Sequence, residues 1–218
     1  MKIAISNLKG GVGKSTLSQN LAVCFAHMEF KTCLVDTDTN QNSLAWSGVR
    51  PDALPSVTVV GATDPKALGK AVDNLHRDYD AVLIDGTPSL SEMTTRIIIA
   101  ADLLLIPILP SAHDFRAMQP FFERLDQAKA FRGEIPAFFV INQYSPSANV
   151  YKRMTEAIRG LGIEVLDTVI HRRAVYAETA IDGKGAYEGG DPKARDEMVR
   201  LTREVLDKAA IYNLIKAQ

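Results

Sequence analysis

The sequence is 218 residues long, enough for one well-buried core, and its 46% hydrophobic and 23% charged residues are typical of a globular protein. The formal net charge is −1, from 25 basic and 26 acidic residues. This balance excludes a chain that grips nucleic acid through its overall charge, but it allows a local basic patch. No apolar stretch approaches the ~20 residues of a membrane span. The chain enters a strand-like run at Lys2 without a signal peptide, so we expect a cytoplasmic protein.

Short apolar runs alternate with longer helix-periodic segments, which is the pattern of a parallel sheet covered by helices. Residues 81–84 and 103–106 are apolar without alternation, as in strands buried on both faces. We expect strands at 2–6, 32–36, 57–60, 80–84, 102–108, 137–141 and 164–169. We expect helices at 14–28, 65–76, 90–100, 114–130, 148–160 and 195–209. No linker or repeat interrupts the pattern, so residues 1–218 are predicted to form one α/β domain, a mostly parallel twisted sheet with helices on both faces.

Several residues are better explained by packing than by chemistry. The apolar stripe of the last predicted helix indicates a core face and consists of Met198, Leu201, Val205 and Ala209. Cys24 and Cys33 lie in apolar segments without ligand spacing, which favours buried structural thiols. We expect Trp46 to be a packing residue and His113 to be a surface or dimer-face histidine. Residues 182–192 are the most loop-like stretch.

A glycine-rich segment follows the first predicted strand and opens an amphipathic helix. It fits G-x-x-x-x-G-K-[ST] except that Leu8 replaces the first glycine. Its glycines allow successive N–H groups to converge on phosphate oxygens, the lysine adds charge for the β- and γ-phosphates, and the Ser hydroxyl can ligate Mg²⁺. The helix that follows contributes its N-terminal partial charge. The candidate nucleotide-binding residues are therefore Gly10, Gly11, Val12, Gly13, Lys14, Ser15 and Thr16.

The segment Lys9-Gly10-Gly11-Val12-Gly13-Lys14-Ser15-Thr16 resembles the deviant Walker A motif of the ParA/MinD family of P-loop ATPases. The closest resemblance is to short ParA-type partition ATPases without an N-terminal helix-turn-helix. In that family the lysine at the Lys9 position reaches across a dimer to the partner's nucleotide, much as an arginine finger does. The resemblance implies catalytic roles for Lys9 and Lys14, with ATP and Mg²⁺ as cofactors. From the residues alone, Lys9 could also be a solvated loop cation.

Carboxylates stand at the ends of two predicted strands, where α/β folds bind ligands. Asp36 and Asp38 follow one strand, and Asp85 ends the apolar run Ala81-Val82-Leu83-Ile84. The family resemblance assigns Asp38 to hydrolysis and Asp36 to the magnesium surroundings, while Asp85 resembles a Walker B aspartate. Thr39 replaces the usual proline of this segment. The candidate metal residues are Ser15, Asp36 and Asp85, with helix N-capping as the alternative role for a strand-end aspartate.

Later segments carry a weaker resemblance. Residues 100–114 resemble the family's strand and loop at the dimer face, and Asn142 resembles the asparagine that meets the adenine. An ordinary turn residue is the alternative role for Asn142. Residues 170–179 resemble the segment near the DNA-facing surface. The candidate DNA contacts are Arg172, Arg173, Lys193, Arg195, Arg200 and Arg203, although Asp196–Arg200 and Arg203–Asp207 have the spacing of helix salt bridges.

The resemblance implies a slow, partner-stimulated ATPase that forms an ATP-dependent homodimer and binds DNA non-specifically. Its partners would be DNA and a small ParB-type or cargo adaptor protein, with no membrane, and the ATP-bound form would associate with the nucleoid. One alternative is a MinD-like membrane-surface ATPase, but the tail after Ala209 carries one lysine and lacks a basic face. A P-loop metabolic enzyme of the dethiobiotin synthetase or amidoligase type is another alternative. An iron-protein reductase is disfavoured, because it would need cysteines at a dimer axis, whereas Cys24 and Cys33 lie in a predicted helix and a predicted strand. A nucleotide-binding scaffold without turnover remains open.

Overall fold

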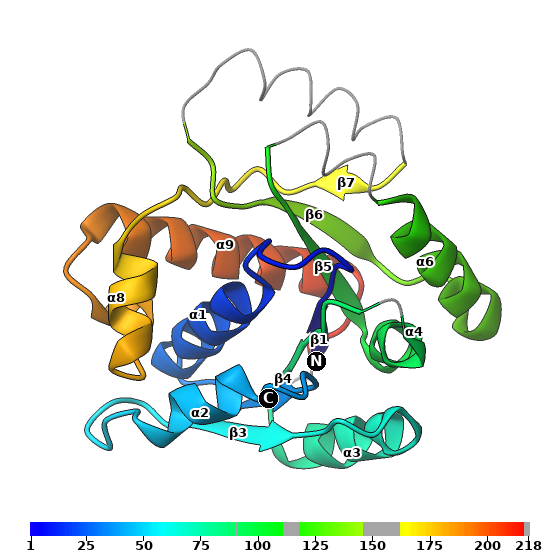
Figure 1. Cartoon of the computed structure of the whole chain (residues 1–218), viewed down its shortest axis with the longest axis horizontal. Coiled ribbons are helices and arrows are strands. Elements are labelled where there is room, and N and C mark those ends of the chain that lie inside the picture. The colour runs from blue at the N-terminus through cyan, green and yellow to red at the C-terminus, as the bar shows by residue number, and fades with distance from the viewer. Residues whose placement is uncertain (90, 111–117, 146–161, 216–218) are drawn as a thin grey trace.

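The computed structural model describes residues 1–89, 91–110, 118–145 and 162–215. Its centre is a seven-stranded sheet in the order β3-β2-β4-β1-β5-β6-β7, and every strand pair in it is parallel (Figure 1). The strands are β1 (Lys2–Ile5), β2 (Thr32–Asp36), β3 (Val57–Gly61), β4 (Ala81–Asp85), β5 (Leu103–Ile108), β6 (Ala137–Ile141) and β7 (Glu164–Val165). The predicted α/β class with a parallel sheet is confirmed.

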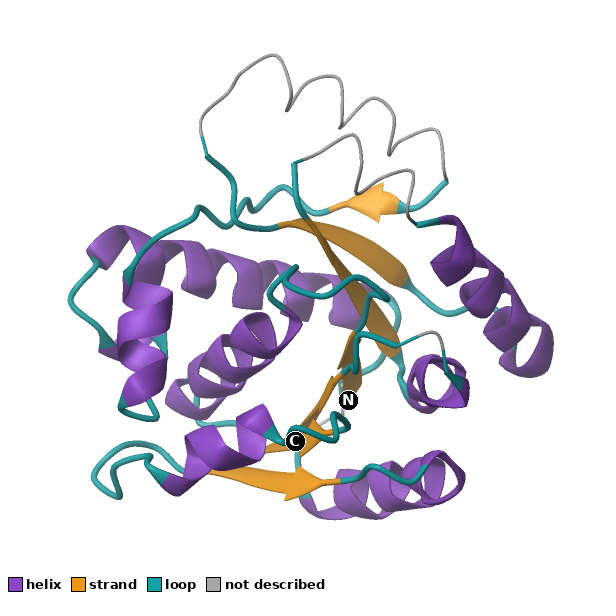
Figure 2. Ribbon diagram, in the orientation of Figure 1, coloured by secondary structure: helices purple, strands orange, loops and turns teal. Residues whose placement is uncertain are grey.

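Helices cover both faces of the sheet (Figure 2). One face packs against α1 (Lys14–His27) and α9 (Pro192–Ile211), flanked by α2 (Asn42–Gly48), α8 (Val175–Ile181) and the short 3₁₀ helix η1 (Ala186–Glu188). The other face packs against α3 (Pro65–Asp78), α4 (Glu92–Ala100) and α6 (Gln119–Arg132). Each central strand therefore contributes to two cores, which explains why its sequence is apolar without alternation.

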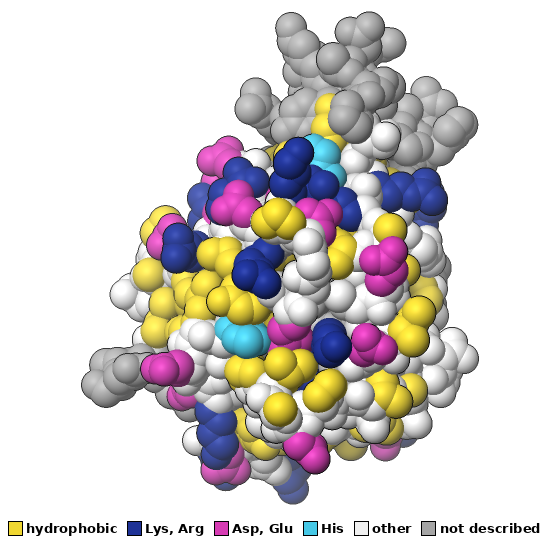
Figure 3. Space-filling model, turned by 90° about the vertical axis from the view of Figure 1, so that its left-hand side faces the viewer, with side chains coloured by type: hydrophobic (Ala, Val, Ile, Leu, Met, Phe, Trp, Pro, Cys, Tyr) yellow, Lys and Arg dark blue, Asp and Glu magenta, His cyan; other side chains and the backbone are white. Residues whose placement is uncertain are grey.

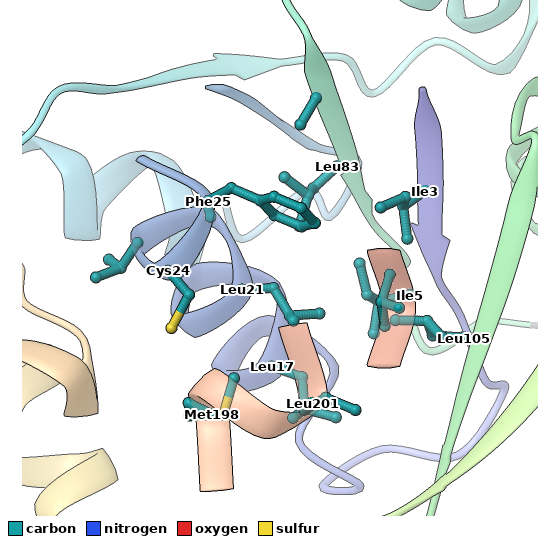
Figure 4. Close-up of a cluster of buried hydrophobic side chains, with 14 of the residues drawn as sticks. Ile3, Ile5, Leu17, Leu21, Cys24, Phe25, Leu83, Leu105, Met198 and Leu201 are labelled. Atoms are coloured by element: carbon teal, nitrogen blue, oxygen red, sulfur yellow. The ribbon is translucent and has the colours of Figure 1, made fainter. Parts of the chain in front are cut away.

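The core between the sheet and α1 is close-packed (Figure 4). Leu21 and Phe25 of α1 face Ile3 of β1 and Leu83 of β4, and all four are fully buried. Burying one such Leu, Ile or Phe side chain stabilises the fold by roughly 1.5–3 kcal/mol. The predicted apolar stripe of α9 joins this core, since its members are all 0% exposed: Met198, Leu201, Val205 and Ala209.

The strand predictions are confirmed to within a few residues, except for the last one. Residues 164–169 were expected to be one strand, but β7 ends at Val165. The backbone N–H groups of Asp167 and Thr168 donate to the Glu204 carboxylate of α9, at 2.6 and 3.0 Å. Backbone bonds to β6 are made on either side of them, by Leu166 and Ile170, so Glu204 holds the chain where the pairing with β6 is interrupted.

The helix predictions are confirmed to within a few residues for α1, α3, α4 and α9, and for α6 from Gln119 onward, while residues 114–117 of the helix expected at 114–130 lie outside the described residues. The expected helix at 148–160 lies outside the described residues. Sequence reasoning missed two short helices, α2 and α8, because each has only seven residues and no capping side chain of its own. No helix in the described ranges is both long and apolar enough to cross a membrane.

The residues expected to pack do so. Trp46 is 5% exposed and its indole N–H donates to the Lys184 carbonyl, while Cys24 and Cys33 are buried free thiols. The loop-like stretch 182–192 contains η1, whose Glu188 forms a two-pronged ion pair with the buried Arg50 at 2.7 and 3.0 Å. His113 lies outside the described residues.

Candidate functional site

The predicted site residues converge at the carboxyl edge of the sheet. The register pairs Asp85 with Ile5 on one side and with Asp36 on the other. Ile5 leads directly into the glycine-rich loop. The loop and the two strand-end aspartates are therefore neighbours because β4 lies between β1 and β2. This is the edge at which parallel α/β sheets bind ligands.

The glycine-rich loop has the backbone conformation that its glycines allow. Gly11 and Gly13 have φ of +75° and +86°, in the left-handed region that side chains disfavour. A Cβ on Gly13 would also lie 2.3 Å from the amide nitrogen of Asn142. Within the described part of the chain, the N–H groups of residues 10–16 make no backbone hydrogen bond. The loop therefore presents a run of N–H donors at the start of α1, which is the arrangement that binds phosphate.

Lys14 lies inside this loop. Its side-chain nitrogen donates to the carbonyl of Lys9 at 2.8 Å. Burial lowers the pKa of Lys14 to about 8, and the nearby carboxylates of Asp85 and Asp38 oppose that shift. A phosphate group would supply the negative charge that this half-desolvated ammonium lacks. The partly exposed Lys9 lies at the rim of the loop, with its backbone N–H donating to Asn7 Oδ1.

Asp85 is surrounded by hydroxyl groups. It is 1% exposed, with Ser43 Oγ at 2.8 Å and Ser18 Oγ at 3.3 Å, and the Ser15 side chain also hydrogen-bonds to it. Burial raises the pKa of Asp85 to about 6, although these hydroxyl donors and Lys14 favour the carboxylate. A cation beside Ser15 would therefore relieve a buried carboxylate.

The other two carboxylates differ in what they contact. Asp36 is fully buried and accepts backbone N–H groups from Asp38, Ser43 and Leu44, at 3.1, 2.8 and 3.1 Å. It therefore caps the first turn of α2, which is the alternative role considered from the sequence. In this position it orients Ser43, which in turn donates to Asp85. Asp38 is only partly buried and lies close enough to Lys14 to act on its charge.

A cavity of about 270 Å³ adjoins the loop. It is lined by Gly13, Thr16 and Leu17, by the residues that follow β6, and by residues 170–173 with α8, and residues 170–172 are hydrogen-bonded directly beside the end of β6. Asn142 and Gln143 are the residues that follow β6, and their side-chain amides donate to the carbonyls of Val12 and Gly11, both at 2.8 Å. Asn142 thus both lines the cavity and contacts the loop.

The site has two halves. We call residues 9–16 with Asp85 the loop half, and the 270 Å³ cavity with its walls the pocket half. Residues 171–173 of the pocket half are held by Glu197 of α9, which is 3% exposed. Glu197 accepts from Arg173 Nη2 at 2.7 Å and from the backbone N–H of His171 at 3.1 Å, and it lies 2.9 Å from His171 Nδ1.

The predicted DNA-contact residues fall into different environments. Arg173 is occupied by Glu197 and Asp191 and lines the pocket, so its charge is neutralised inside the subunit. Arg200 pairs with Asp196 at 3.3 Å, as its spacing suggested, and Arg195 lies 5.3 Å from the Tyr187 ring centroid. The remaining members are exposed: Arg172, Lys193 and Arg203. Basic and acidic side chains are interspersed on the face of the molecule that carries α8 (Figure 3).

The residues present fit a magnesium nucleotide. In the described ranges no three His, Cys, Asp or Glu side chains gather as a metal cage. Magnesium in phosphate sites needs no such cage, because it keeps several waters and uses one or two protein oxygens with the phosphates. The Ser15 hydroxyl beside Asp85 supplies such an oxygen, and the N–H groups of the loop supply the phosphate donors.

Sequence reasoning missed five polar residues of the site. Two are hydroxyl partners of Asp85, and three belong to the pocket half: Ser18, Ser43, Gln143, His171 and Glu197. Ser18 lies one turn after Lys14, so helical spacing could have found it. The others come together only through the tertiary fold, and the sequence carries no local signal for them.

Comparisons with known proteins agree with this geometry. A sequence model of the CobQ/CobB/MinD/ParA nucleotide binding domain matches residues 3–186. Maintenance of carboxysome distribution protein A of Halothiobacillus neapolitanus is 32% identical over 213 residues, covering 94% of this chain and 95% of that protein. The chromosome-partitioning ATPase Soj of Thermus thermophilus is 28% identical over 217 residues, covering 84% of this chain and 86% of its own.

Solved structures share the fold. The septum site-determining protein MinD of Pyrococcus horikoshii, complexed with Mg-ADP, superimposes with a TM-score of 0.74 at 21% identity, covering 96% of this chain and 97% of that one. Apo McdA from Cyanthece superimposes with a TM-score of 0.78 at 16% identity, covering 94% and 98%. Both likenesses span nearly the whole of each chain.

Proposed function

Because the chain belongs to the CobQ/CobB/MinD/ParA nucleotide-binding family, in which ParA/MinD proteins are ATPases, we propose that it binds ATP with Mg²⁺ and hydrolyses it slowly. The reaction would serve to position a large cargo, DNA or a protein assembly. The relative that maintains carboxysome distribution, 32% identical over almost the full length of both chains, supports a positioning role.

One observation carries the nucleotide assignment. The buried Lys14 lies between a run of N–H donors and the Asp85–Ser15 pair, so one small space offers an ammonium, amide donors and a metal ligand. In this assignment the N–H groups of the loop and Lys14 would hold the β- and γ-phosphates, and Ser15 would ligate the cation, with the Asp85 carboxylate beside Ser15 offsetting its charge. Bound Mg²⁺ supplies neutralisation of the charge that develops on the transferred phosphoryl group.

The pocket half suits the nucleoside. The cavity begins at Gly13 and Thr16, next to the expected phosphate position, and Asn142 borders it. The Asn142 amide nitrogen is committed to Val12, so its oxygen remains the group with which it would accept a hydrogen bond from the base.

Lys14→Ala tests the assignment most simply. It should lower ATP affinity by at least about 100-fold, because the loop loses the buried ammonium group that would pair with the phosphates. Lys66→Ala on the exposed surface of α3 is the matched control and should leave affinity unchanged. Unchanged ATP affinity in Lys14→Ala, measured by calorimetry, would rule out the assignment.

Asp38 is the proposed hydrolytic residue. Asp38 is partly exposed and lies close enough to raise the pKa of Lys14, so its carboxylate is near the expected phosphate position. We propose that it orients the attacking water and does not ligate the cation. Asp38→Ala should keep ATP and Mg²⁺ binding, abolish hydrolysis and leave the ATP-bound dimer trapped, which light scattering would detect. Normal turnover, or a monomer in ATP, counts against this role.

Lys9 is proposed to act across the ATP dimer. Its backbone carbonyl contacts Lys14, so Lys9 sits at the rim beside the phosphate position. Lys9→Ala should still bind ADP but fail to dimerise with ATP or hydrolyse it. Equal loss of ADP affinity would mean that Lys9 serves its own subunit.

We further propose that the ATP dimer binds DNA without sequence preference, on the nucleoid, and that a small ParB-type or cargo adaptor protein stimulates it. The proposed contacts are Arg172, Lys193, Arg195, Arg200 and Arg203, which are exposed, while Arg173 is half-buried against the two carboxylates of Glu197 and Asp191 and is the weakest candidate of the predicted set. Each subunit offers a weak patch in which acidic side chains intervene, and dimerisation would join two of them.

A mobility-shift series on unrelated duplexes tests this step. Binding with ATP should fall with salt at a slope of about −0.9 per phosphate neutralised. Arg172→Ala should weaken binding to all sequences alike and leave ATP dimerisation intact. Absence of ATP-dependent binding at low salt would contradict a DNA matrix.

A further inference from the structure

Two neighbouring amide side chains of the pocket half donate hydrogen bonds to the backbone of the glycine-rich loop. Asn142 Nδ2 donates to the Val12 carbonyl and Gln143 Nε2 donates to the Gly11 carbonyl, each at 2.8 Å. Both residues follow β6, more than 125 positions away in the sequence. The contacts are made on consecutive peptide groups of the loop, 11–12 and 12–13.

The direction of these contacts has a geometric consequence. A trans peptide group points its C=O and its N–H in opposite directions, and the described chain contains no cis peptide bond. Holding the carbonyls of Gly11 and Val12 toward β6 therefore turns the N–H groups of Val12 and Gly13 away from β6. These are two of the N–H groups that make no backbone hydrogen bond in the described part of the chain.

Gln143 adopts an uncommon backbone conformation in making this contact. Its φ is +52°, in the left-handed region that non-glycine residues seldom occupy. Such conformations persist where the surroundings hold them in place, often at functional sites. Asn142 constrains the loop in a different way, because its amide nitrogen fills the space beside Gly13 where a Cβ would stand.

We propose that Gln143 is a positioning residue for phosphate: its amide presets the peptide between Gly11 and Val12 so that the Val12 N–H faces the phosphate of the nucleotide. Asn142 does the same for Gly13 and in addition borders the base. The loop half and the pocket half are thereby joined through two side chains. This inference rests on the proposed nucleotide site.

The structure offers an unusually close control. Gln41, which precedes α2, has φ of +50° and an exposed side chain. It therefore shares the positive φ of Gln143, and among the described residues its side chain makes no contact with the loop comparable to that of Gln143. Gln143→Met keeps the length of the side chain and removes its N–H donors. Gln41→Met makes the same replacement at a position with nearly the same φ. The pair separates the lost contact from any backbone effect.

The experiment is calorimetric titration of both variants and the wild type with Mg-ADP and with Mg-pyrophosphate. We expect Gln143→Met to lose about five- to tenfold in affinity for both ligands, the amount that one hydrogen bond contributes. Equal losses are expected because the defect lies in the phosphate donors. Gln41→Met should bind both ligands like the wild type. Gln143→Gly, which relaxes the backbone but also lacks the amide, should show the same loss as Gln143→Met.

Each other result overturns the proposal. Wild-type pyrophosphate affinity in Gln143→Met, with weaker ADP binding, would make Gln143 a base contact. A loss in Gln41→Met as large as that in Gln143→Met, or full affinity in Gln143→Gly, would make the effect one of backbone strain. If the wild type binds neither ligand, the proposed nucleotide site itself fails, which is a different outcome from failure of the Gln143 role.

Discussion

The loop half and the pocket half of the site are built in opposite ways. The loop half is almost contiguous, with residues 9–16 needing only Asp85 from the neighbouring β4. The pocket half is assembled from α1, the end of β6, the segment 170–173 and α8, and it is held by Glu197 from α9. A contiguous half can be recognised from sequence and carries the chemistry shared by a family.

The largest loss of nucleotide affinity should come from a change at Gly13, where the loop half contacts Asn142 of the pocket half. Gly13→Ala places a methyl group 2.3 Å from the Asn142 amide and forces alanine to φ of +86°. We expect loss of both ADP and pyrophosphate affinity by at least about 100-fold, or ~2.7 kcal/mol. Gly10→Ala is the control within the same loop, because its Cβ meets nothing within 4 Å, and its loss should be smaller. Equal affinities of the two variants would contradict this geometry.

A change confined to the pocket half should separate the two ligands. Glu197→Gln removes the charge that holds Arg173 and His171, and should lower stability by about 1–3 kcal/mol. ADP affinity should fall several-fold while pyrophosphate affinity stays unchanged. Glu204→Gln, on the same helix but holding residues 167–168, should leave both affinities intact. Denaturant unfolding and calorimetry would check this, and a parallel loss of pyrophosphate binding would show that the halves are not separable in this way.

Within the loop half, the buried carboxylate predicts a pH dependence. Burial raises the pKa of Asp85 from 3.8 to about 6, so the folded apo protein holds this proton more tightly than the unfolded chain. The resulting stabilisation is complete below pH 3.8 and is lost as pH rises through about 6. Asp85→Asn does not titrate, so its stability relative to the wild type should increase between pH 4 and 7, by up to ~3 kcal/mol. A constant difference across this range would mean that Asp85 is not held in a desolvated state.

The smallest effect is expected outside both halves. Arg200 and Asp196 form an exposed i,i+4 pair on α9, so Arg200→Ala should change stability by less than about 0.5 kcal/mol. Its ATP and pyrophosphate affinities should equal those of the wild type. A larger change in unfolding free energy would show that Arg200 has a structural role beyond this pair.

The same contrast explains what could be predicted from the sequence. The strands and the loop half follow from local patterns, because buried parallel strands are continuously apolar and the phosphate loop is a single motif. The strand end at Val165 could not be predicted, since Glu204 of α9 holds the chain just beyond it. The capping contacts of Asp36 could not be predicted, because they depend on the position of α2, and its place in the magnesium surroundings stays a prediction.

The pocket half shows the limit more clearly. Arg173 carries the same charge as its neighbour Arg172, yet it is neutralised by Glu197, 24 residues further along the chain. Asn142 was recognised by resemblance, but Gln143 was not, because nothing in the sequence indicates that its amide reaches Gly11. Contacts of this kind arise from the crossing of distant elements and leave no periodic signal.

The account depends on a loop whose backbone N–H groups bind phosphate. The most direct measurement follows the ¹H–¹⁵N resonances of residues 10–16 during titration with Mg-pyrophosphate, which lacks a base and therefore reports the loop half alone. The account predicts saturable downfield shifts of the Val12 and Gly13 amides in the wild type and their loss in Lys14→Ala. Amide resonances of this loop that do not move at saturating pyrophosphate would contradict it.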